Sequence, residues 1–227
     1  WRDAPAISFS AFYLGDSEAD ALAAVESLST LGTVDELQTL TVTDALRSTS
    51  REVSIRSVDV LDHHGRDVVE VVVDCIAPDP LRYGPESSSS SGLPSLSGGL
   101  AFPFVFPVNF ASSGVPGRVV LSNVGTQASW PTFTVSGGLA SGFSLVCVET
   151  GQEIRFEFPL SVTDVVTIDA RSGRAWINDE SNSVTGYVTV ADWWLVPAGA
   201  SRTVQFTALG ASSGSPLLTG AVAPAYL

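Results

Sequence analysis

The sequence contains no lysine and no methionine, and only two cysteines and two histidines among 227 residues. Its 11 basic residues are therefore all arginines, and 24 acidic residues outweigh them to give a net charge of −13. A chain of this charge repels the phosphate backbone, which argues against nucleic acid as a direct partner. No apolar run approaches the roughly 18 residues that a membrane-spanning helix requires, so no membrane partner is expected.

The scarcity of cysteine and histidine also limits the chemistry. Cys75 and Cys147 each lie in an apolar, strand-like run, so we expect buried free thiols rather than a disulfide or a metal framework. His63 and His64 lie in a polar segment between two strands, and no spacing supplies a third ligand. We interpret them as an exposed turn. The sequence predicts no metal site and no cofactor.

Catalytic motifs are missing as well. The sequence has no nucleophile elbow, no phosphate-binding loop and no zinc-protease motif, so we predict no catalytic residue and no enzymatic activity. A pair of carboxylates suited to glycoside hydrolysis stays open as an alternative, because the acidic residues of the second half are scattered. Since the chain has no methionine, we also expect Trp1 not to be a translation start and the first domain to be incomplete at its beginning.

The first 84 residues predict a β-sheet domain with one helix. Asp16 or Ser17 offers an N-cap, and Gly32 ends the helical pattern. The apolar residues at helical spacing between them are Ala21, Leu22, Val25, Leu28 and Leu31. Alternating segments on both sides predict strands, and the two that flank residues 62–67 predict a β-hairpin.

The composition changes abruptly after Gly84. The stretch ESSSSSGLPSLSGG cannot bury apolar area, so we predict a flexible linker over residues 85–99. Residues 100–227 then show short alternating segments separated by Gly, Asn, Asp and Ser, which predict eight or nine strands. The predicted fold class is mainly β: an N-terminal β-sheet domain with one helix, then a C-terminal β-sandwich of jelly-roll or galectin-like type.

The stretch GGLAFPFVFPVNF, residues 98–110, predicts the first strand of this sandwich. Its phenylalanines fall on one face, and two prolines remove hydrogen-bond donors from one edge. An ordinary core strand is one interpretation, and contact with another domain or subunit is the other. The candidate contact residues are Phe102, Phe104, Phe106 and Phe110.

Tryptophans offer a second candidate surface. Trp193 and Trp194 are consecutive, so they point to opposite faces of a strand, one into the core and one outward. An exposed indole can stack on a sugar ring, whereas a core indole only packs. The candidates for glycan stacking are Trp130, Trp176 and Trp193.

Several short stretches carry a resemblance to a known family. They are Asp79–Gly84, Gly98–Pro107, Asn123–Thr126, Trp130–Pro131, Thr150–Gly151, Ile168–Arg171 and Trp193–Gly199. In this order and spacing they resemble the domain junction and C-terminal domain of siphophage distal tail (Dit-like) and related minor tail proteins, especially of phages that infect actinobacteria. The sequence departs from the family at Ser201, where an Asn is common, and the family's opening strands are missing before Trp1.

The resemblance implies a structural protein of the virion at the distal end of a phage tail. Such proteins form a ring, usually a hexamer, that joins the tail tube to the hub or baseplate while the sandwich domains project outward. The implied partners are copies of the chain itself, the tail tube protein, the tail hub and other minor tail proteins, with the tape measure protein as a further candidate. The alternative is a carbohydrate-binding module of the tail tip that reads a cell-surface glycan. The acidic charge suits a channel that DNA passes without sticking.

Overall fold

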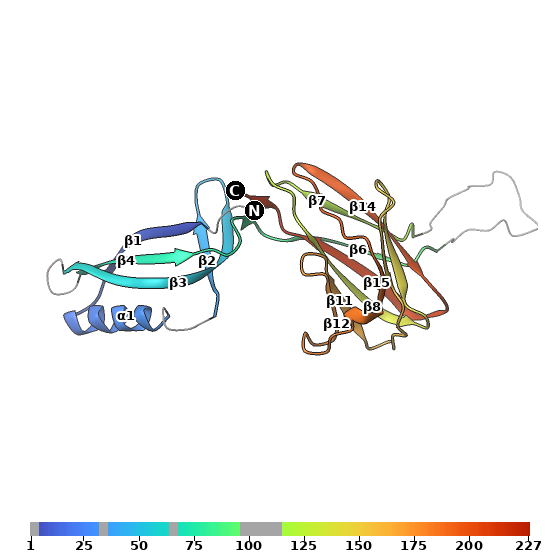
Figure 1. Ribbon diagram of the computed structural model, residues 1–227, viewed down its shortest axis with the longest axis horizontal. Helices are drawn as coiled ribbons and strands as arrows, with labels where there is room; N and C mark the ends of the chain where they lie inside the picture. Colours follow the sequence, from blue (N-terminus) through green and yellow to red (C-terminus); the bar gives the residue numbers. More distant parts are fainter. Residues whose placement is uncertain (1–4, 32–35, 64–67, 96–114) are drawn as a thin grey trace, which may run out of the picture. The chain divides into compact units, whose positions relative to one another are not determined.

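The computed structural model describes residues 5–31, 36–63, 68–95 and 115–227, and the chain divides into two compact units (Figure 1). The first unit comprises residues 1–84 together with 226–227, and the second comprises residues 85–225. Strands dominate both units, and the α-helix of the described chain lies in the first. The predicted fold class is thus confirmed.

The first unit is a six-stranded sheet with a helix on one face. Its strands are β1 (Ala6–Leu14), β2 (Gln38–Thr43), β3 (Ser48–His63), β4 (Val68–Ile76), β5 (Arg82–Tyr83) and β16 (Ala225–Tyr226). They run in the order β1-β4-β3-β5-β16, with β2 paired to β3. Strands β3 and β4 are antiparallel, which confirms the predicted hairpin pairing. Helix α1 (Glu18–Leu31) packs against β4, β3 and β1 (Figure 1).

The helix begins at the predicted cap, since the Asp20 N–H donates to Ser17 Oγ over 3.2 Å. It packs on the sheet through Ala21, Val25 and Leu28. The expectation that Leu22 shares this face is wrong, because its side chain is 48% exposed. Only about one residue in each turn of the helix contacts the sheet, and Leu22 lies next to that row of residues rather than in it.

Strand β4 is the central element of the first unit. Its side chains alternate between buried and half-buried along its whole length, so both faces of the sheet can be assigned from it. Val69 and Val71 lie under the helix with Ala21, while Val73 and Cys75 pack with Val53 in a second small cluster. Cys75 is a buried free thiol, as expected.

The second unit is a β-sandwich of two five-stranded sheets. One sheet has the order β13 (Val188–Ala191), β10 (Glu153–Phe156), β9 (Phe143–Cys147), β14 (Ala200–Ala208), β7 (Arg118–Asn123). The other has the order β12 (Arg174–Ile177), β11 (Val165–Asp169), β8 (Pro131–Leu139), β15 (Ser212–Val222), β6 (Ser87–Gly92). A short 3-10 helix, η1 (Thr185–Tyr187), precedes β13. The segments around Thr150–Gly151 and Ser172–Gly173 are the turns of two antiparallel hairpins, β9-β10 and β11-β12.

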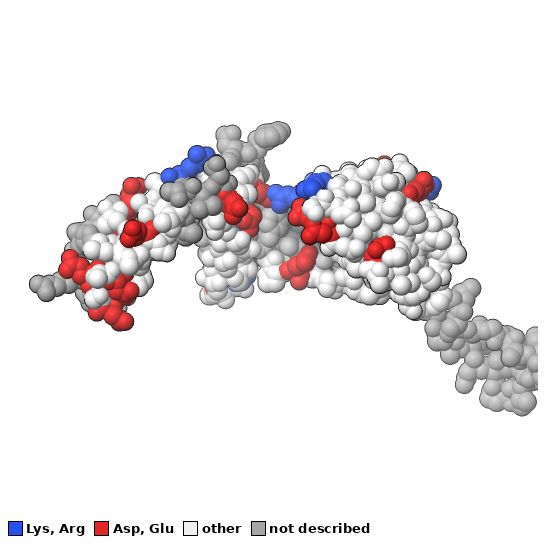
Figure 2. Space-filling view, turned by 90° about the horizontal axis from the view of Figure 1, so that it is seen from below, with Lys and Arg blue, Asp and Glu red and all other residues white. Residues whose placement is uncertain are grey.

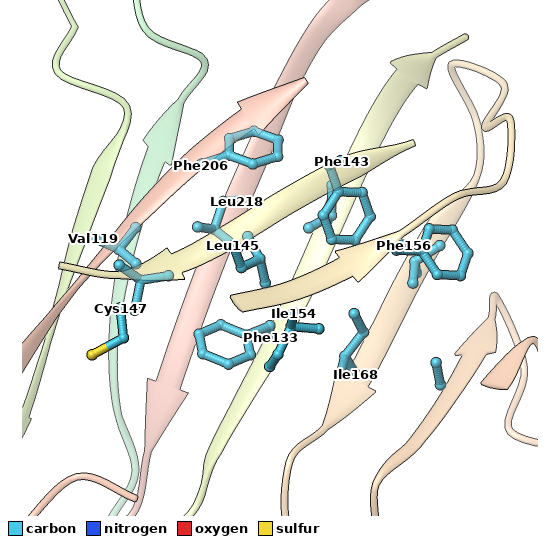
Figure 3. Packing of buried hydrophobic residues seen from close by; sticks show 14 of the residues in the cluster. Val119, Phe133, Phe143, Leu145, Cys147, Ile154, Phe156, Ile168, Phe206 and Leu218 are labelled. Atoms are coloured by element: carbon cyan, nitrogen blue, oxygen red, sulfur yellow. The ribbon is translucent and has the colours of Figure 1, made fainter. Parts of the chain in front are cut away.

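One continuous core fills the space between the two sheets (Figure 3). Its four fully buried phenylalanines, Phe133, Phe143, Phe156 and Phe206, come from both sheets. Burying each such side chain contributes roughly 1.5–3 kcal/mol relative to leaving it in water. Cys147 belongs to this core as a second free thiol. The core explains the clean alternation of the sequence, since inward positions must be apolar.

The serine run is a strand, which corrects the linker expected over residues 85–99 for Ser87–Gly92. Strand β6 pairs antiparallel with β15 over its whole length. Its hydroxyls also contact the edge of β7 in the other sheet: Val120 N–H donates to Ser89 Oγ over 3.4 Å, and Ser87 Oγ donates to the Ser122 carbonyl over 3.4 Å. Small polar side chains suit this position between the edges of the two sheets, because strand β6 is held by backbone hydrogen bonds rather than by buried apolar side chains.

This strand also explains the strand count. The sandwich has ten strands rather than the eight or nine expected, because β6 was assigned to the linker. The sandwich also ends earlier than expected, since residues 226–227 belong to the first unit. The strand expected at residues 98–110 lies outside the described residues.

Candidate assembly surfaces

The sheet of the first unit has one face that turns away from helix α1. On β4 the side chains of this face are Val68, Glu70, Val72, Asp74 and Ile76, all half-buried. The register places Ser8 of β1 opposite Asp74, and Phe12 opposite Glu70. Every β1 side chain on this face is exposed, including Phe12 at 64% and Leu14 at 72%. Exposed apolar side chains of this size on an ordered strand are typical of a surface that another protein covers.

Three carboxylates lie on this face. Asp59 of β3 lies opposite Val72, so it shares the face with Glu70 and Asp74. Ser57 Oγ donates to both Asp59 Oδ2 over 3.0 Å and Asp74 Oδ2 over 3.4 Å. Figure 2 shows a second gathering of acidic side chains at one end of this unit, and Glu18 and Asp20 supply acidic charge in the first turn of α1. The described part of the sheet face therefore presents carboxylates and serines in its middle.

Strand β1 forms one margin of the same sheet, with β4 as its partner on the inner side. It is nine residues long. A long strand at a sheet margin offers a row of backbone donors and acceptors to another chain. This edge and the exposed side chains beside it form one continuous candidate contact surface, which we call the β1 surface: Phe12, Leu14 and the outer edge of Ala6–Leu14.

The outer face of the sandwich sheet β13-β10-β9-β14-β7 carries a polar network. Arg155 Nε donates to Glu153 Oε1 over 2.8 Å, and Ser144 Oγ donates to the same oxygen over 2.7 Å. The hydrogen bonds from Arg155 and then from Ser144 hold the pKa of Glu153 below its ordinary value. A general acid in glycoside hydrolysis needs a raised pKa. Glu153 is therefore a poor candidate for that role.

Nothing in the described residues assembles a metal centre, since no group of three His, Cys, Asp or Glu side chains comes together there. In the same residues, no helix is long and apolar enough to cross a membrane. His63 ends β3, and His64 lies outside the described residues.

The three tryptophans proposed for glycan stacking come from three different segments of the sandwich. Trp130 precedes β8, Trp176 lies on β12 opposite Thr167, and Trp193 follows β13. All three are half-buried, and Trp193 packs against the core cluster with its indole beside Gly173. Of the consecutive pair, Trp194 is the core residue, at 3% exposure. Trp194 is thus the core member of the pair, as expected, whereas Trp193 packs against the core rather than pointing fully outward.

The four candidate phenylalanines, Phe102, Phe104, Phe106 and Phe110, lie outside the described residues. The described residues on either side of them are hydrogen-bonded to one another. Ser95 N–H donates to the Val115 carbonyl over 3.0 Å, and Val115 N–H donates to Ser95 Oγ over 3.3 Å. The chain therefore leaves and re-enters the sandwich at one place, between β6 and β7.

Comparison with known proteins finds a family that part of the sandwich matches. Residues 124–212 match a family described as siphovirus-type tail component, C-terminal domain. No curated protein sequence matches the chain. The matched range runs from the end of β7 to the start of β15, so it contains most of the sandwich.

Solved structures of phage tail proteins share the fold of the whole chain. The Dit protein of phage SPP1, described as a paradigm of the hub adsorption apparatus in phages that infect Gram-positive bacteria, matches with a TM-score of 0.65 at 15% identity, covering 100% of this chain and 81% of that one. A chain of the phage P2 baseplate activated with Ca matches with a TM-score of 0.50 at 9% identity, covering 96% of this chain and 78% of that one. A chain of the p2 baseplate with Sr matches with a TM-score of 0.51 at 10% identity and the same coverage. None of these descriptions names a carbohydrate.

Proposed function

We propose, from the premise that this chain is a Dit-like bacteriophage tail protein, that copies of it form a ring joining the tail tube to the hub or baseplate. In this proposal the first unit is the ring-forming part, and the sandwich projects from the ring. The observation that carries it is the β1 surface, a nine-residue strand at the margin of the sheet with Phe12 64% and Leu14 72% exposed. A long strand at a sheet margin is a place where another chain can pair.

Ring assembly can be tested by the mass of the full chain in solution, measured by light scattering over a range of concentrations, with negative-stain images of the same sample. We expect closed rings with a central opening. Leu14→Asp places a charge at the β1 surface and should shift the chain to monomer without lowering its melting temperature. The matched control is Val124→Asp, because Val124 is 70% exposed, close to the 72% of Leu14, and lies on the sandwich.

Two results would contradict the proposal. One is a wild-type chain that stays monomeric at every concentration. The other is a ring that Leu14→Asp leaves intact, since a charge in the centre of a subunit contact costs several kcal/mol when it loses water. The order of the ring, expected to be six, follows from counting subunits in the images.

We further propose that the acidic sheet face of the first unit lines the channel of this ring. Asp59, Glu70 and Asp74 would then repel the phosphates of passing DNA. The wild-type chain should not retard duplex DNA in a native gel at low salt, whereas a ring of the double variant Asp59→Arg, Asp74→Arg should. Normal DNA ejection by phage particles that carry this variant would refute the channel assignment.

We also propose that the segment with Phe102, Phe104, Phe106 and Phe110 contacts a neighbouring subunit or tail protein. Its sequence is strongly apolar, and the chain on both sides of it is anchored by the Ser95 and Val115 hydrogen bonds. Phe104→Asp should leave the melting of the sandwich unchanged and prevent assembly of the particle. Assembly at the wild-type level with Phe104→Asp would remove this role.

A further inference from the structure

Two arginines lie opposite each other in the sheet of the first unit. Strands β3 and β5 are antiparallel, with Ser50 opposite Tyr83. This register places Arg51 opposite Arg82, so both side chains leave the same face of the sheet with their Cβ atoms about 5 Å apart. Burial and then the charge of Arg82 lower the pKa of Arg51. Like charges in this position destabilise a sheet, and a carboxylate of a partner would relieve the repulsion.

Neither guanidinium forms an ion pair with a carboxylate of the described chain. Arg51 Nε is buried without a hydrogen-bond partner among the described residues, and Arg82 Nη2 donates to the Leu227 carbonyl over 2.8 Å. A third arginine of the same unit, Arg47, lies with its guanidinium 4.2 Å from the centre of the Tyr226 ring. The three arginines therefore keep their positive charge available to another molecule.

Two carboxylates act on these arginines through their charge, and both accept hydrogen bonds from other donors. Backbone hydrogen bonds within its own turn lower the pKa of Asp44, and the charges of Arg47 and Arg82 lower it further. Asp79, whose charge acts on Arg51, accepts from a backbone N–H over 2.9 Å and from a tyrosine hydroxyl over 2.6 Å. Three arginines thus outnumber two engaged carboxylates in a chain of net charge −13. We call Arg47, Arg51 and Arg82 the arginine end.

The opposite end of the same unit carries carboxylates without partners. Strand β1 ends with Leu14 opposite Val68, the first residue of β4, whereas β5 follows the last residue of β4. The nine residues of β4 separate the two ends by roughly 30 Å. Helix α1 begins just after β1, and neither Asp16 nor Glu18 accepts a hydrogen bond through its exposed carboxylate within the described chain (Figure 1). We call Asp16 and Glu18 the acidic end.

Both ends lie on the helix side of the sheet. Arg51 is two residues from Val53, which packs with Val73 and Cys75 on the face of β4 that helix α1 covers further along. The carboxylates assigned to the channel lie on the other face. The two ends are therefore available to neighbouring copies outside the channel.

Each end also presents an exposed leucine beside its charges. Leu14 of the β1 surface lies two residues before Asp16, and Leu46, which is 84% exposed, directly precedes Arg47. An apolar centre with a charged rim is the usual composition of a protein contact surface. The acidic end thus extends the β1 surface, and the arginine end has the matching composition with the opposite sign of charge.

We propose that the acidic end of one copy contacts the arginine end of the next copy, an inference that rests on the proposed ring function. A ring requires a head-to-tail contact between two different patches, whereas a two-fold dimer brings each patch against itself. The two ends attract each other, and each repels its own kind. The contact therefore favours a closed ring over a symmetric pair, and it offsets the repulsion between copies of net charge −13.

Charge reversal on the full chain tests this contact. Light scattering at roughly 0.15 M salt gives the protein concentration at which half of the chain is assembled. Arg51→Glu and Glu18→Arg should each raise that concentration about tenfold or more, because like charges then face each other. The double variant should return it to within about threefold of the wild type, because opposite charges face each other again.

Melting temperatures separate assembly from folding. Arg51→Glu should not lower the melting temperature, since it replaces a like-charge pair with Arg82 by an opposite pair. The matched control is Arg118→Glu, which makes the same change of charge on the sandwich, where Arg118 Nε donates to Gln205 Oε1 over 2.8 Å. Its assembly should equal that of the wild type.

The inference is overturned if Glu18→Arg assembles like the wild type, or if the double variant assembles no better than Arg51→Glu. If Leu14→Asp dissolves the ring while both single charge variants leave it unchanged, this contact is wrong and the ring proposal stands. A wild-type chain that stays monomeric overturns the ring and this contact together.

Discussion

A single buried serine can decide whether the run Ser87–Gly92 is a strand or a tether. Ser91 is 9% exposed and lies opposite Leu218, a fully buried core residue of β15. Ser88, three residues earlier in the same run, is exposed. In a flexible linker the two positions would be equivalent. We therefore compare Ser91→Asp with Ser88→Asp, which add the same carboxylate to the same strand.

The expected cost follows from the alternatives open to a buried carboxylate. It can stay charged without a partner, or it can take up a proton, and the cheaper option sets the cost. Protonating an aspartate of ordinary pKa near 3.9 at pH 7 costs about 4 kcal/mol, at 1.36 kcal/mol for each pH unit. We expect Ser91→Asp to cost nearly that much at pH 7 and only about 1.5 kcal/mol at pH 5. Ser88→Asp should change the free energy of unfolding by less than about 0.5 kcal/mol.

Thermal unfolding followed by tryptophan fluorescence measures this difference. Four of the five tryptophans, Trp130, Trp176, Trp193 and Trp194, lie in the sandwich, so the signal reports mainly on that unit. A loss of 4 kcal/mol lowers the midpoint of a domain of this size by roughly 10 °C. The folded state raises the pKa of the introduced carboxyl, so the penalty must shrink as the pH falls. Equal midpoints for the two variants at pH 7 would refute the strand and restore the linker.

Three further predictions concern the sandwich and the thiols. Gly142→Ala should lower the free energy of unfolding in urea by several kcal/mol more than Gly151→Ala does. Both glycines have a positive φ, but only at Gly142 would the added Cβ collide with backbone atoms, so equal losses for the two variants would exclude the collision. The thermal midpoint should fall as the pH drops below about 4.5, the ordinary pKa of glutamate. Burial raises the pKa of Glu149, but its hydrogen bonds together outweigh burial and lower it, and hydrogen bonds also lower the pKa of Glu153. The stabilisation that such groups give is lost on protonation, so a midpoint that is constant from pH 6 to pH 3 would contradict this. Cys75 and Cys147 should resist a thiol reagent in the native protein and react only at the rate of unfolding. Both thiols are buried, and burial raises the pKa of Cys75. Fast labelling of either cysteine would contradict this, because it would show that the surrounding structure opens.

Local patterns in the sequence predict the elements whose contacts are local. The cap at Ser17 and the spacing of Ala21, Val25 and Leu28 place the helix, and alternation places Ile154 and Phe156 inside the sandwich. The same alternation predicts Phe158 inside, yet Phe158 is only half-buried, because β10 ends at Phe156 after a register shift. Periodicity indicates which face a residue is on, but it does not indicate where a strand ends.

Other features depend on partners that are distant in the chain, and composition misleads there. A serine run reads as a tether unless the sheet edge that it pairs with is known, and that edge, β15, lies more than a hundred residues later. Residues 141, 157–159 and 209 line one surface depression of the sandwich, and no motif marks them as neighbours. Tryptophans attract a glycan interpretation because they are conspicuous, yet Trp194 is a core residue and Trp130, Trp176 and Trp193 are half-buried.

At the last residues of the described chain, the domain boundary predicted from the sequence differs from the boundary in the structure. Tyr226 packs with the Arg47 guanidinium 4.2 Å from the centre of its ring, and the Leu227 carbonyl accepts a hydrogen bond from Arg82 Nη2 over 2.8 Å. Both contacts are with the first unit, so the sandwich is an insertion between β5 and β16 of one sheet. Because closing a loop costs free energy that grows only slowly with its length, a sheet can accept a whole domain between two of its strands. The first unit is therefore completed only after the sandwich has been synthesised, and a cut after residue 225 would damage the first unit rather than the sandwich.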